Sequence, residues 1–385
     1  MSLPDSPLAL LNNLTPTEFL AEYWQKKPLL IRQAIPNFEG LLTPNELAGL
    51  ACEETVEARI IQNKNDQWQV EDAPFNEDDF TSLPEKYWTL LVQSVNHHLP
   101  EAAGLLSLFS FIPLARLDDL MVSYAPTGGS VGAHLDSYDV FLLQGGGTRR
   151  WEISTQTDFT LVENAPLRLL KYFKAEQEWV LSPGDMLYLP PNIAHHGVSE
   201  DDDCMTYSIG FRAPGKQELM QGFLEHLQDI VQAGGLYEDA DLGLQQHPAE
   251  ISADMIAKVE TILQNIKWDK STISGFLGRV LTEPKVGVFF EPVDTDATGE
   301  VTIDNFSQAL SEQTLWLDLQ SILLFSSNNF YINGELLSVP TNIQTCIQEL
   351  ADKRSLNTPL LNDAQRRMLA ETLHTALLSG YIAVE

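Results

Sequence analysis

The sequence predicts a multidomain α+β protein whose central part is a jelly roll or barrel of short strands. Its 385 residues exceed the length of one ordinary domain. Between residues 120 and 211, short β-type runs follow one another without intervening helices, as is typical of jelly rolls and barrels. We therefore expect a β-rich domain with a partly helical N-terminal part over 1–214, a helical region over 215–285, and a small α+β module over 286–385.

Two segments near the N-terminus share the same helix-start pattern. Each has threonine, proline and then glutamate at the third helical position, which matches a capping box with proline at the first helical position; they begin at Thr15 and Thr43. Residues 56–62 and 67–70, separated by the polar run 63–66, predict a hairpin. Residues 87–99 predict a helix.

The central strands are expected between clusters of glycine, proline and serine. These breaks occur at residues 126–129, 145–147 and 182–185. The candidate strands are 120–125, 138–144, 150–154, 179–181, 186–189 and 204–211.

The spacing of hydrophobic residues changes to a helical period after residue 214. One apolar stripe runs over 219–231 and another over 255–266, so both segments predict helices. Such stripes pack either within their own chain or against a second copy, and a homodimer is one of these two expectations. Over 286–385, strand-like runs, the turn Asn333-Gly334 and a helix over 364–378 favour a winged-helix-like module.

The charge balance restricts the partners. The chain has 23 basic and 54 acidic residues, a net charge of −31, and the last hundred residues alone carry −9 (4 basic minus 13 acidic). A field of this sign repels phosphate backbones, so we expect no direct nucleic-acid binding and a basic protein as partner. No apolar run is long enough to cross a membrane, no signal peptide is recognisable, and three scattered cysteines fit a reducing compartment. A cytoplasmic protein is expected.

His134-Leu135-Asp136 is the strongest chemical signal. On a strand, alternate residues point to the same face, so the imidazole and the carboxylate can bind one metal ion. A third ligand is expected from His195 or His196, which follow the predicted strand 186–189. Two histidines and a carboxylate occupy one face of an octahedral iron and leave three positions open. The alternative is that these histidines only stabilise turns. His97 and His98, on the predicted helix over 87–99, are interpreted as structural.

A basic pair, Arg149-Arg150, follows the glycine turn 145–147. A planar guanidinium holds a carboxylate through two parallel hydrogen bonds, so one of these arginines is a candidate for binding an acidic cosubstrate inside the barrel. The alternative is a solvated basic pair on a hairpin. Because neighbouring residues on a strand point to opposite faces, one arginine should point inward and the other outward.

Several segments of the chain resemble the bacterial ribosomal oxygenase family, JmjC/cupin-type enzymes with a double-stranded β-helix (jelly-roll) core. The matching segments are 23–28, 118–123, 132–141, 149–151, 184–191 and 207–214. The resemblance implies that His134, Asp136 and His195 bind Fe(II), because the family's third ligand lies four residues after the second proline of a pair, here Pro191. It also implies that Arg149 binds 2-oxoglutarate, with Ser123 as a second contact, and its glycine turn leaves Arg150 as an alternative.

The resemblance further implies an activity and partners. Members of the family hydroxylate an arginine of the large-subunit ribosomal protein L-sixteen, so a basic ribosomal protein is the expected substrate. Asp118 or Asp119, near the predicted site, is a candidate to neutralise a guanidinium, and the alternative is that both acids only face solvent. The layout after residue 214 is similar to the family's dimerisation and winged-helix regions. Two alternatives stay open: a JmjC hydroxylase of histidine or lysine in another basic protein, and a non-catalytic metal-binding scaffold.

Overall fold

The computed structural model of the chain describes residues 5–64, 67–212, 214–232, 234–293 and 301–385. The chain folds into two units. The barrel unit comprises Met1–Ala213 with Lys285–Glu291 and Asp318–Gln320, and the C-terminal unit comprises Pro214–Pro284, Pro292–Leu317 and Ser321–Glu385. The domain boundaries expected at 214 and 285 stay predictions.

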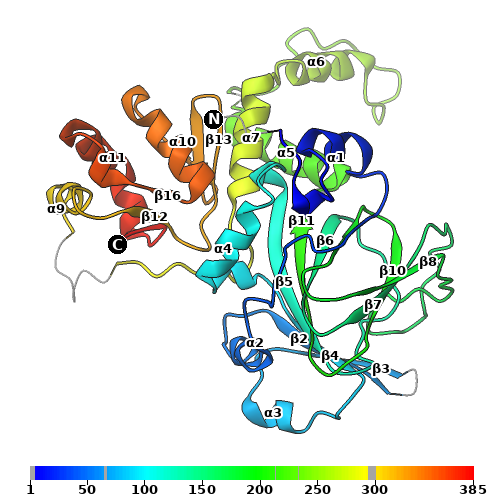
Figure 1. Cartoon of the computed structure of the whole chain (residues 1–385). Coiled ribbons are helices and arrows are strands. Elements are labelled where there is room, and N and C mark those ends of the chain that lie inside the picture. The colour runs from blue at the N-terminus through cyan, green and yellow to red at the C-terminus, as the bar shows by residue number, and fades with distance from the viewer. Residues whose placement is uncertain (1–4, 65–66, 213, 233, 294–300) are drawn as a thin grey trace. The chain divides into compact units, whose positions relative to one another are not determined.

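Two antiparallel sheets form the barrel unit, which confirms the expected jelly-roll core (Figure 1). The large sheet has the order β1 (Leu29–Ile31), β9 (Met186–Leu189), β6 (Asp139–Gly146), β11 (Cys204–Phe211), β5 (Leu117–Ala125), β4 (Trp88–Val92), β2 (Ala58–Lys64) and β3 (Gln67–Asp72). The small sheet has the order β10 (Ala194–Ser199), β7 (Arg149–Ser154) and β8 (Gln177–Leu181). Apolar side chains of β6 and β9 pack against those of β7 and β8, so the two sheets enclose an interior.

The outer face of the large sheet is covered by the N-terminal segment. Both expected capping boxes are confirmed, at the starts of α1 (Pro16–Glu22) and α2 (Pro44–Ala51). Phe19 of α1 is fully buried, and its ring centroid lies 5.0 Å from that of Tyr188 and 5.6 Å from that of Phe141. With one face on this layer and the other on the interior, β11 is buried along its whole length.

The prediction of a helix over residues 87–99 is wrong. Residues 88–92 form β4, which pairs with β2 and β5, and His97 ends a short 3-10 helix, Val95–His97. Four of the five residues of β4 are buried, so its sequence shows no alternation from which to recognise a strand. Hydrogen bonds from both neighbouring strands outweigh the local helical preference. A helix, α4 (Pro100–Ser107), follows only after this segment.

The other elements of the barrel unit are short. The expected hairpin is confirmed as β2 and β3, and residues 65 and 66 of its turn lie outside the described residues. The expected central strands are confirmed with small changes of bounds, whereas β1 and β10 were not predicted. The remaining helical turns are Ala9–Leu11, α3 (Glu77–Thr81) and Leu114–Arg116.

The C-terminal unit begins with three helices, α5 (Lys216–Ile230), α6 (Ala253–Leu263) and α7 (Lys270–Thr282). The first two match the predicted stripes, and α7 was not predicted. Among the residues of α6, all of which the structure describes, none is buried. α5 buries only Leu227 among its own residues. The apolar stripes are therefore largely exposed within this chain.

A winged-helix fold completes the C-terminal unit. Its elements are α9 (Ile303–Ala309), β12 (Leu315–Leu317), β13 (Leu323–Ser326), β14 (Asn329–Ile332), β15 (Glu335–Leu337), Thr341–Ile343, α10 (Gln344–Lys353), β16 (Ser355–Leu356), Thr358–Leu360, α11 (Asp363–Leu378) and β17 (Ile382–Val384). The strands form two antiparallel sheets, β16-β12-β17 and β13-β14-β15. Within the described parts of the chain, no helix combines the length and the apolar character needed to span a membrane.

Candidate metal and cosubstrate site

The His-Leu-Asp triplet lies between β5 and β6 and not on a strand, which corrects the expectation from its spacing. His134 forms an isolated bridge with His195, and His195 lies on β10. Each of the two residues donates its backbone N–H to the carbonyl oxygen of the other, at 3.0 Å in both directions. The main chain therefore brings the triplet and the third histidine together.

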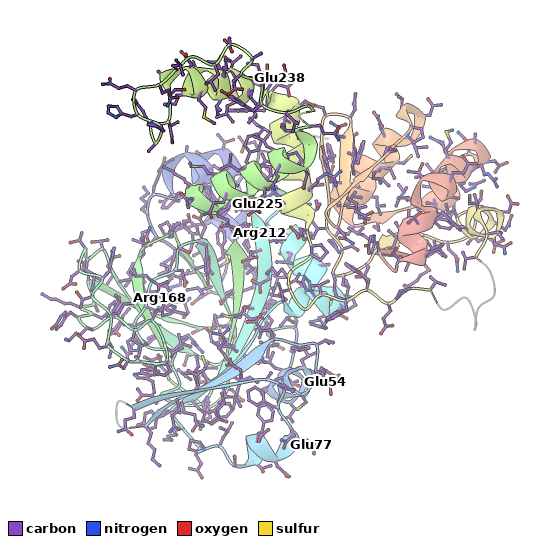
Figure 2. All side chains as sticks on the ribbon, turned by 180° about the vertical axis from the view of Figure 1, so that it is seen from behind. Glu54, Glu77, Arg168, Arg212, Glu225 and Glu238 are labelled. Carbon is purple, nitrogen blue, oxygen red and sulfur yellow. The ribbon has the colours of Figure 1, made fainter. Side chains whose placement is uncertain are left out.

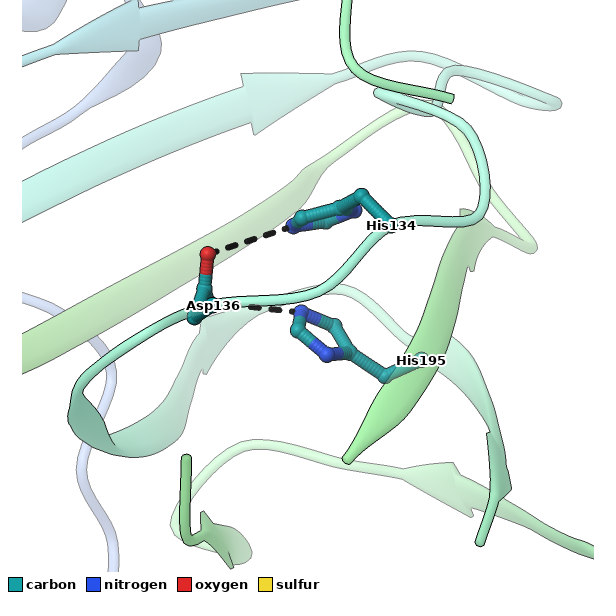
Figure 3. Close-up of side chains that lie close together, drawn as sticks. All are labelled: His134, Asp136 and His195. Carbon is teal, nitrogen blue, oxygen red and sulfur yellow. Dashed lines mark ion pairs between the residues drawn. The ribbon is translucent and has the colours of Figure 1, made fainter. Parts of the chain in front are cut away.

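The side chains of His134, Asp136 and His195 converge on one point (Figure 3). Nε2 of His134 lies 3.8 Å from Oδ1 of Asp136, and Nε2 of His195 lies 3.5 Å from Oδ2 of the same carboxylate. One donor atom from each residue lies within 4.8 Å of the other two. Two imidazole nitrogens and one carboxylate oxygen at this separation fit the face of an octahedral divalent metal ion.

The backbone fixes the orientation of both imidazoles. Nδ1 of His134 contacts the carbonyl oxygen of Gly132, and Nδ1 of His195 contacts that of Ile193, each at 2.9 Å. Because a carbonyl accepts, Nδ1 carries the proton and Nε2 presents its lone pair to the site. Burial and the neighbouring His134 lower the pKa of His195 to about 4, so its ring is neutral at neutral pH. The donor set thus suits a metal cation.

His196 points away from this cluster. Neighbouring residues of β10 alternate between the two faces of the small sheet, and Nδ1 of His196 lies 3.0 Å from Oε2 of Glu152. Its ring also packs edge-on against Phe173. Of the two candidates for the third ligand, the structure brings only His195 to His134 and Asp136.

The two arginines of β7 have opposite surroundings. Arg150 lies on the outer face and pairs with Glu200 at 2.7 Å, Glu152 at 2.9 Å and Glu178 at 3.8 Å. Arg149 is only 3% exposed, and its Nη2 has no hydrogen-bond partner. An unpaired guanidinium donor in a buried position is costly unless a ligand accepts from it. Of the two arginines, Arg149 therefore has the features of a carboxylate-binding residue.

The interior of the barrel holds further unpaired polar atoms. Among the described residues, five buried side-chain atoms have no partner: Arg59 Nε, Asn63 Oδ1, Thr89 Oγ1, Arg149 Nη2 and Trp151 Nε1. The strand registers direct all five side chains to the inner faces of the two sheets, although the Arg59 side chain is 33% exposed and pairs with Glu57 at 3.1 Å. Thr89, Asn63 and Arg59 were not identified from the sequence, because a single polar residue in a strand carries no signal of its own. This interior suits a polar ligand.

Ser123 faces the same interior from β5. It is 3% exposed, and its hydroxyl donates to the carbonyl oxygen of Thr206 at 3.5 Å. A contact of this length is weak, so the hydroxyl can turn toward a ligand. Its expected role as a second cosubstrate contact stays a prediction.

The two acidic residues at the start of β5 are already paired. Oδ1 of Asp118 lies 2.8 Å from Nζ of Lys285 and 3.5 Å from Nε of Arg212. Arg212, which follows β11, is labelled in Figure 2. Asp119 accepts from the backbone N–H of Ser94 at 2.9 Å, and burial raises the pKa of its carboxyl group. Burial and the carboxylate of Asp136 also raise the pKa of Tyr138 above its ordinary value.

Comparisons with known proteins identify relatives of this chain. A JmjC-domain family model matches residues 104–219, and a ROXA-like winged-helix model matches residues 265–382. The chain is 32% identical to the ribosomal protein uL16 3-hydroxylase of Escherichia coli (strain K12), over 94% of this chain and 96% of the relative. It is 34% identical to a probable ribosomal oxygenase of Haemophilus influenzae, over 94% and 92% of the two chains.

Solved structures of a bacterial ribosomal oxygenase have the same fold as this chain. The crystal structure of the Escherichia coli ribosomal oxygenase YcfD superposes with a TM-score of 0.82 at 32% identity, covering 96% of this chain and 98% of the other. The structure of YcfD in complex with cobalt and 2-oxoglutarate superposes with the same TM-score at 31% identity and the same coverage.

Proposed function

This chain belongs to the family of JmjC-domain ribosomal oxygenases, and we propose that it is an Fe(II)- and 2-oxoglutarate-dependent hydroxylase of an arginine side chain in a large-subunit ribosomal protein. The proposal depends mainly on one observation, which is that a set of metal-binding side chains and a buried arginine face the same barrel interior. A set of two histidines and one carboxylate suits a divalent metal, and the buried guanidinium of Arg149 lacks a partner for one of its nitrogens. A metal and a dicarboxylate are the two ligands that such a pair of features binds.

His134, Asp136 and His195 are the residues that would hold the iron. Bound Fe(II) together with 2-oxoglutarate supplies activation of oxygen and insertion of one oxygen atom into a C–H bond, with release of succinate and carbon dioxide. The chain supplies placement. The backbone bridge between His134 and His195 keeps the two imidazoles in position, and their Nδ1 hydrogen bonds keep both Nε2 atoms free to coordinate.

Arg149 and Ser123 are the residues that would bind 2-oxoglutarate. The guanidinium of Arg149 would pair with the carboxylate far from the metal, and the Ser123 hydroxyl would donate to the same ligand. Trp151 and Ile153, which follow Arg149 on the inner face of β7, belong to the apolar cluster between the sheets. This apolar wall excludes water and strengthens the charge-assisted bonds of Arg149.

A basic substrate fits the charge of the chain. The Escherichia coli relative is a uL16 hydroxylase, and a net charge of −31 attracts a basic ribosomal protein. We infer that Asp118 or Asp119 helps to neutralise the arginine that is hydroxylated. Asp118 would then exchange its pairs with Arg212 and Lys285 for one with the substrate.

The test is mass spectrometry of ribosomal proteins from cells with and without this gene. One inserted oxygen atom adds about 16 Da, and fragmentation of the modified peptide identifies the residue. We expect the addition on an arginine of a large-subunit protein. Modification of histidine or lysine in another basic protein would contradict the arginine assignment and leave the oxygenase chemistry standing. No gene-dependent modification would contradict both.

The adjacent histidines of β10 offer a matched pair of variants. We expect His195→Gln to abolish succinate formation coupled to peptide hydroxylation, and Asp136→Ala to do the same, because each removes one metal ligand. His196→Gln should retain activity, since His196 contacts Glu152 on the outer face. Full turnover by His195→Gln or Asp136→Ala with iron still bound would contradict the ligand assignment.

We also infer that the chain forms a homodimer through α5 and α6. Large apolar side chains on both helices are exposed: Met220 is 61% exposed, Leu224 65%, Ile256 58% and Leu263 57%. An apolar surface of this kind, with its members at helical spacing, is typical of a face buried by a partner.

Light scattering after size exclusion tests the dimer. The expected mass is twice the 43.0 kDa of the chain, and Ile256→Asp should reduce it to that of one chain, because a buried carboxylate without a partner destabilises an interface. Leu360→Asp, a change at an exposed leucine outside the two helices, is the matched control. A single-chain mass for the unsubstituted protein would contradict the inference.

A further inference from the structure

The thiol of Cys204 contacts the guanidinium of Arg149 at its Nε atom. This thiol is the only hydrogen-bond acceptor that the described residues provide to this guanidinium, with Sγ 3.2 Å from Nε of Arg149. Cys204 is fully buried at the start of β11, and its side chain points into the barrel from the large sheet. The contact therefore joins the two sheets across the interior.

A row of buried polar side chains fixes the thiol in place. Nε2 of Gln144 lies 3.4 Å from Sγ of Cys204 and donates to the carbonyl oxygen of Gly146 at 2.6 Å. Oε1 of the same amide accepts from the Thr206 hydroxyl at 3.1 Å. Cys204, Gln144 and Thr206 are each no more than 1% exposed. The position of Sγ is thus determined by β6 and β11 together.

The chemistry of this acceptor matters because the chain is so acidic. Within the described parts of the chain, no carboxylate pairs with Arg149, whereas the adjacent Arg150 has three. A carboxylate at position 204 would neutralise the guanidinium and compete with an acidic ligand. A thiol is a weak, uncharged acceptor. It can orient Nε while the positive charge and the Nη2 donor stay available.

We propose that Cys204 is a positioning residue for 2-oxoglutarate: its neutral thiol orients the Arg149 guanidinium without cancelling its charge. The proposal rests on the proposed function, because it takes Arg149 as the residue that binds the distal carboxylate. It assigns to Cys204 a role in binding of the cosubstrate and none in binding of the metal.

The test measures 2-oxoglutarate binding by calorimetry to protein loaded with Mn²⁺ under exclusion of oxygen, so that no turnover is required. Loss of one weak hydrogen bond, about 0.5 to 1.5 kcal/mol, predicts a roughly two- to tenfold weaker affinity for Cys204→Ala. Cys204→Ser keeps an uncharged acceptor and should restore most of the affinity. Cys204→Asp should weaken binding by more than about tenfold, since it supplies a competing charge. Mn²⁺ affinity should be the same in all three variants.

Two controls separate positioning from a general effect on the fold. Cys346→Ser changes another buried cysteine, in the C-terminal unit, and should leave 2-oxoglutarate affinity unchanged. In an Arg149→Met background, Cys204→Ala should have no further effect on 2-oxoglutarate binding, whereas a structural role would persist there.

The outcomes distinguish the two proposals. Equal 2-oxoglutarate affinity for the unsubstituted protein and Cys204→Ala overturns the role of Cys204 alone, as does an undiminished effect of that substitution in the Arg149→Met background. Failure of the unsubstituted, Mn²⁺-loaded protein to bind 2-oxoglutarate would overturn the proposed function itself.

Discussion

Replacement of Arg149 by methionine should move two properties of the protein in opposite directions. Methionine retains a long side chain and removes a buried charge whose Nη2 has no partner. A buried donor without a partner costs about 1 to 3 kcal/mol. The ligand-free variant should therefore gain up to that amount in free energy of unfolding, which corresponds to a rise in Tm of roughly 2 to 10 °C for a unit of this size.

The same change should damage cosubstrate binding. A hydrogen bond to a charged group contributes about 1.5 to 3 kcal/mol, so loss of one such bond predicts roughly 10- to 150-fold weaker 2-oxoglutarate binding. Saturating 2-oxoglutarate should then stabilise the unsubstituted protein and have little effect on the Arg149→Met variant. The order of the two Tm values should reverse when the ligand is added.

Differential scanning fluorimetry with Mn²⁺, with and without 2-oxoglutarate, measures both effects. Arg150→Met is the matched control, because Arg150 pairs with carboxylates on the outer face. We expect it to leave 2-oxoglutarate binding unchanged and to alter stability by no more than about 1 kcal/mol. The reasoning would be refuted if Arg149→Met lowered the Tm of the ligand-free protein and still bound 2-oxoglutarate normally.

Three further changes test other parts of the structure. Gly197→Ala would place a Cβ 2.6 Å from the ring of Trp151, so unfolding in urea should show a loss of about 1 to 3 kcal/mol; an unchanged midpoint would contradict this packing. The hydroxyl of Tyr207 accepts from two consecutive backbone amides at 2.7 and 3.0 Å, so Tyr207→Phe should cost about 1 to 3 kcal/mol in the same assay. Burial lowers the pKa of His98 in the folded protein below its ordinary value of 6.5. The unfolded chain therefore binds a proton at this residue more tightly than the folded protein does. The free energy of unfolding is highest above pH 6.5 and falls as the pH drops below that value. His98→Gln should make unfolding free energies less dependent on pH in this range, and an unchanged pH profile would show that His98 does not contribute.

The architecture could be predicted from the sequence where its periodicity was clear. Glycine and proline breaks located most of the central strands, and capping boxes located α1 and α2. The strand β4 was mistaken for a helix, because a strand buried on both faces has no alternation. β10 was missed because its sequence, Ala194–Ser199, contains a single β-branched residue, Val198. Both strands depend on partners that are distant in sequence, and local preference does not report them.

For the site, spacing located the residues but not their geometry. The spacing of the His-Leu-Asp triplet predicts a strand motif, whereas an isolated backbone bridge positions it. The alternation of a strand limits each pair, His195 or His196 and Arg149 or Arg150, to one inward member. It does not say which member that is. The assignment depends on which face of β7 and β10 meets the large sheet, and that is a property of the whole fold.

The bridge between residues 134 and 195 consists of main-chain groups only, so it does not depend on which side chains these two residues have. Loss of either imidazole would leave these two backbone hydrogen bonds in place. Substitution at either position would therefore change the donor atoms of the site without moving the main chain that presents them.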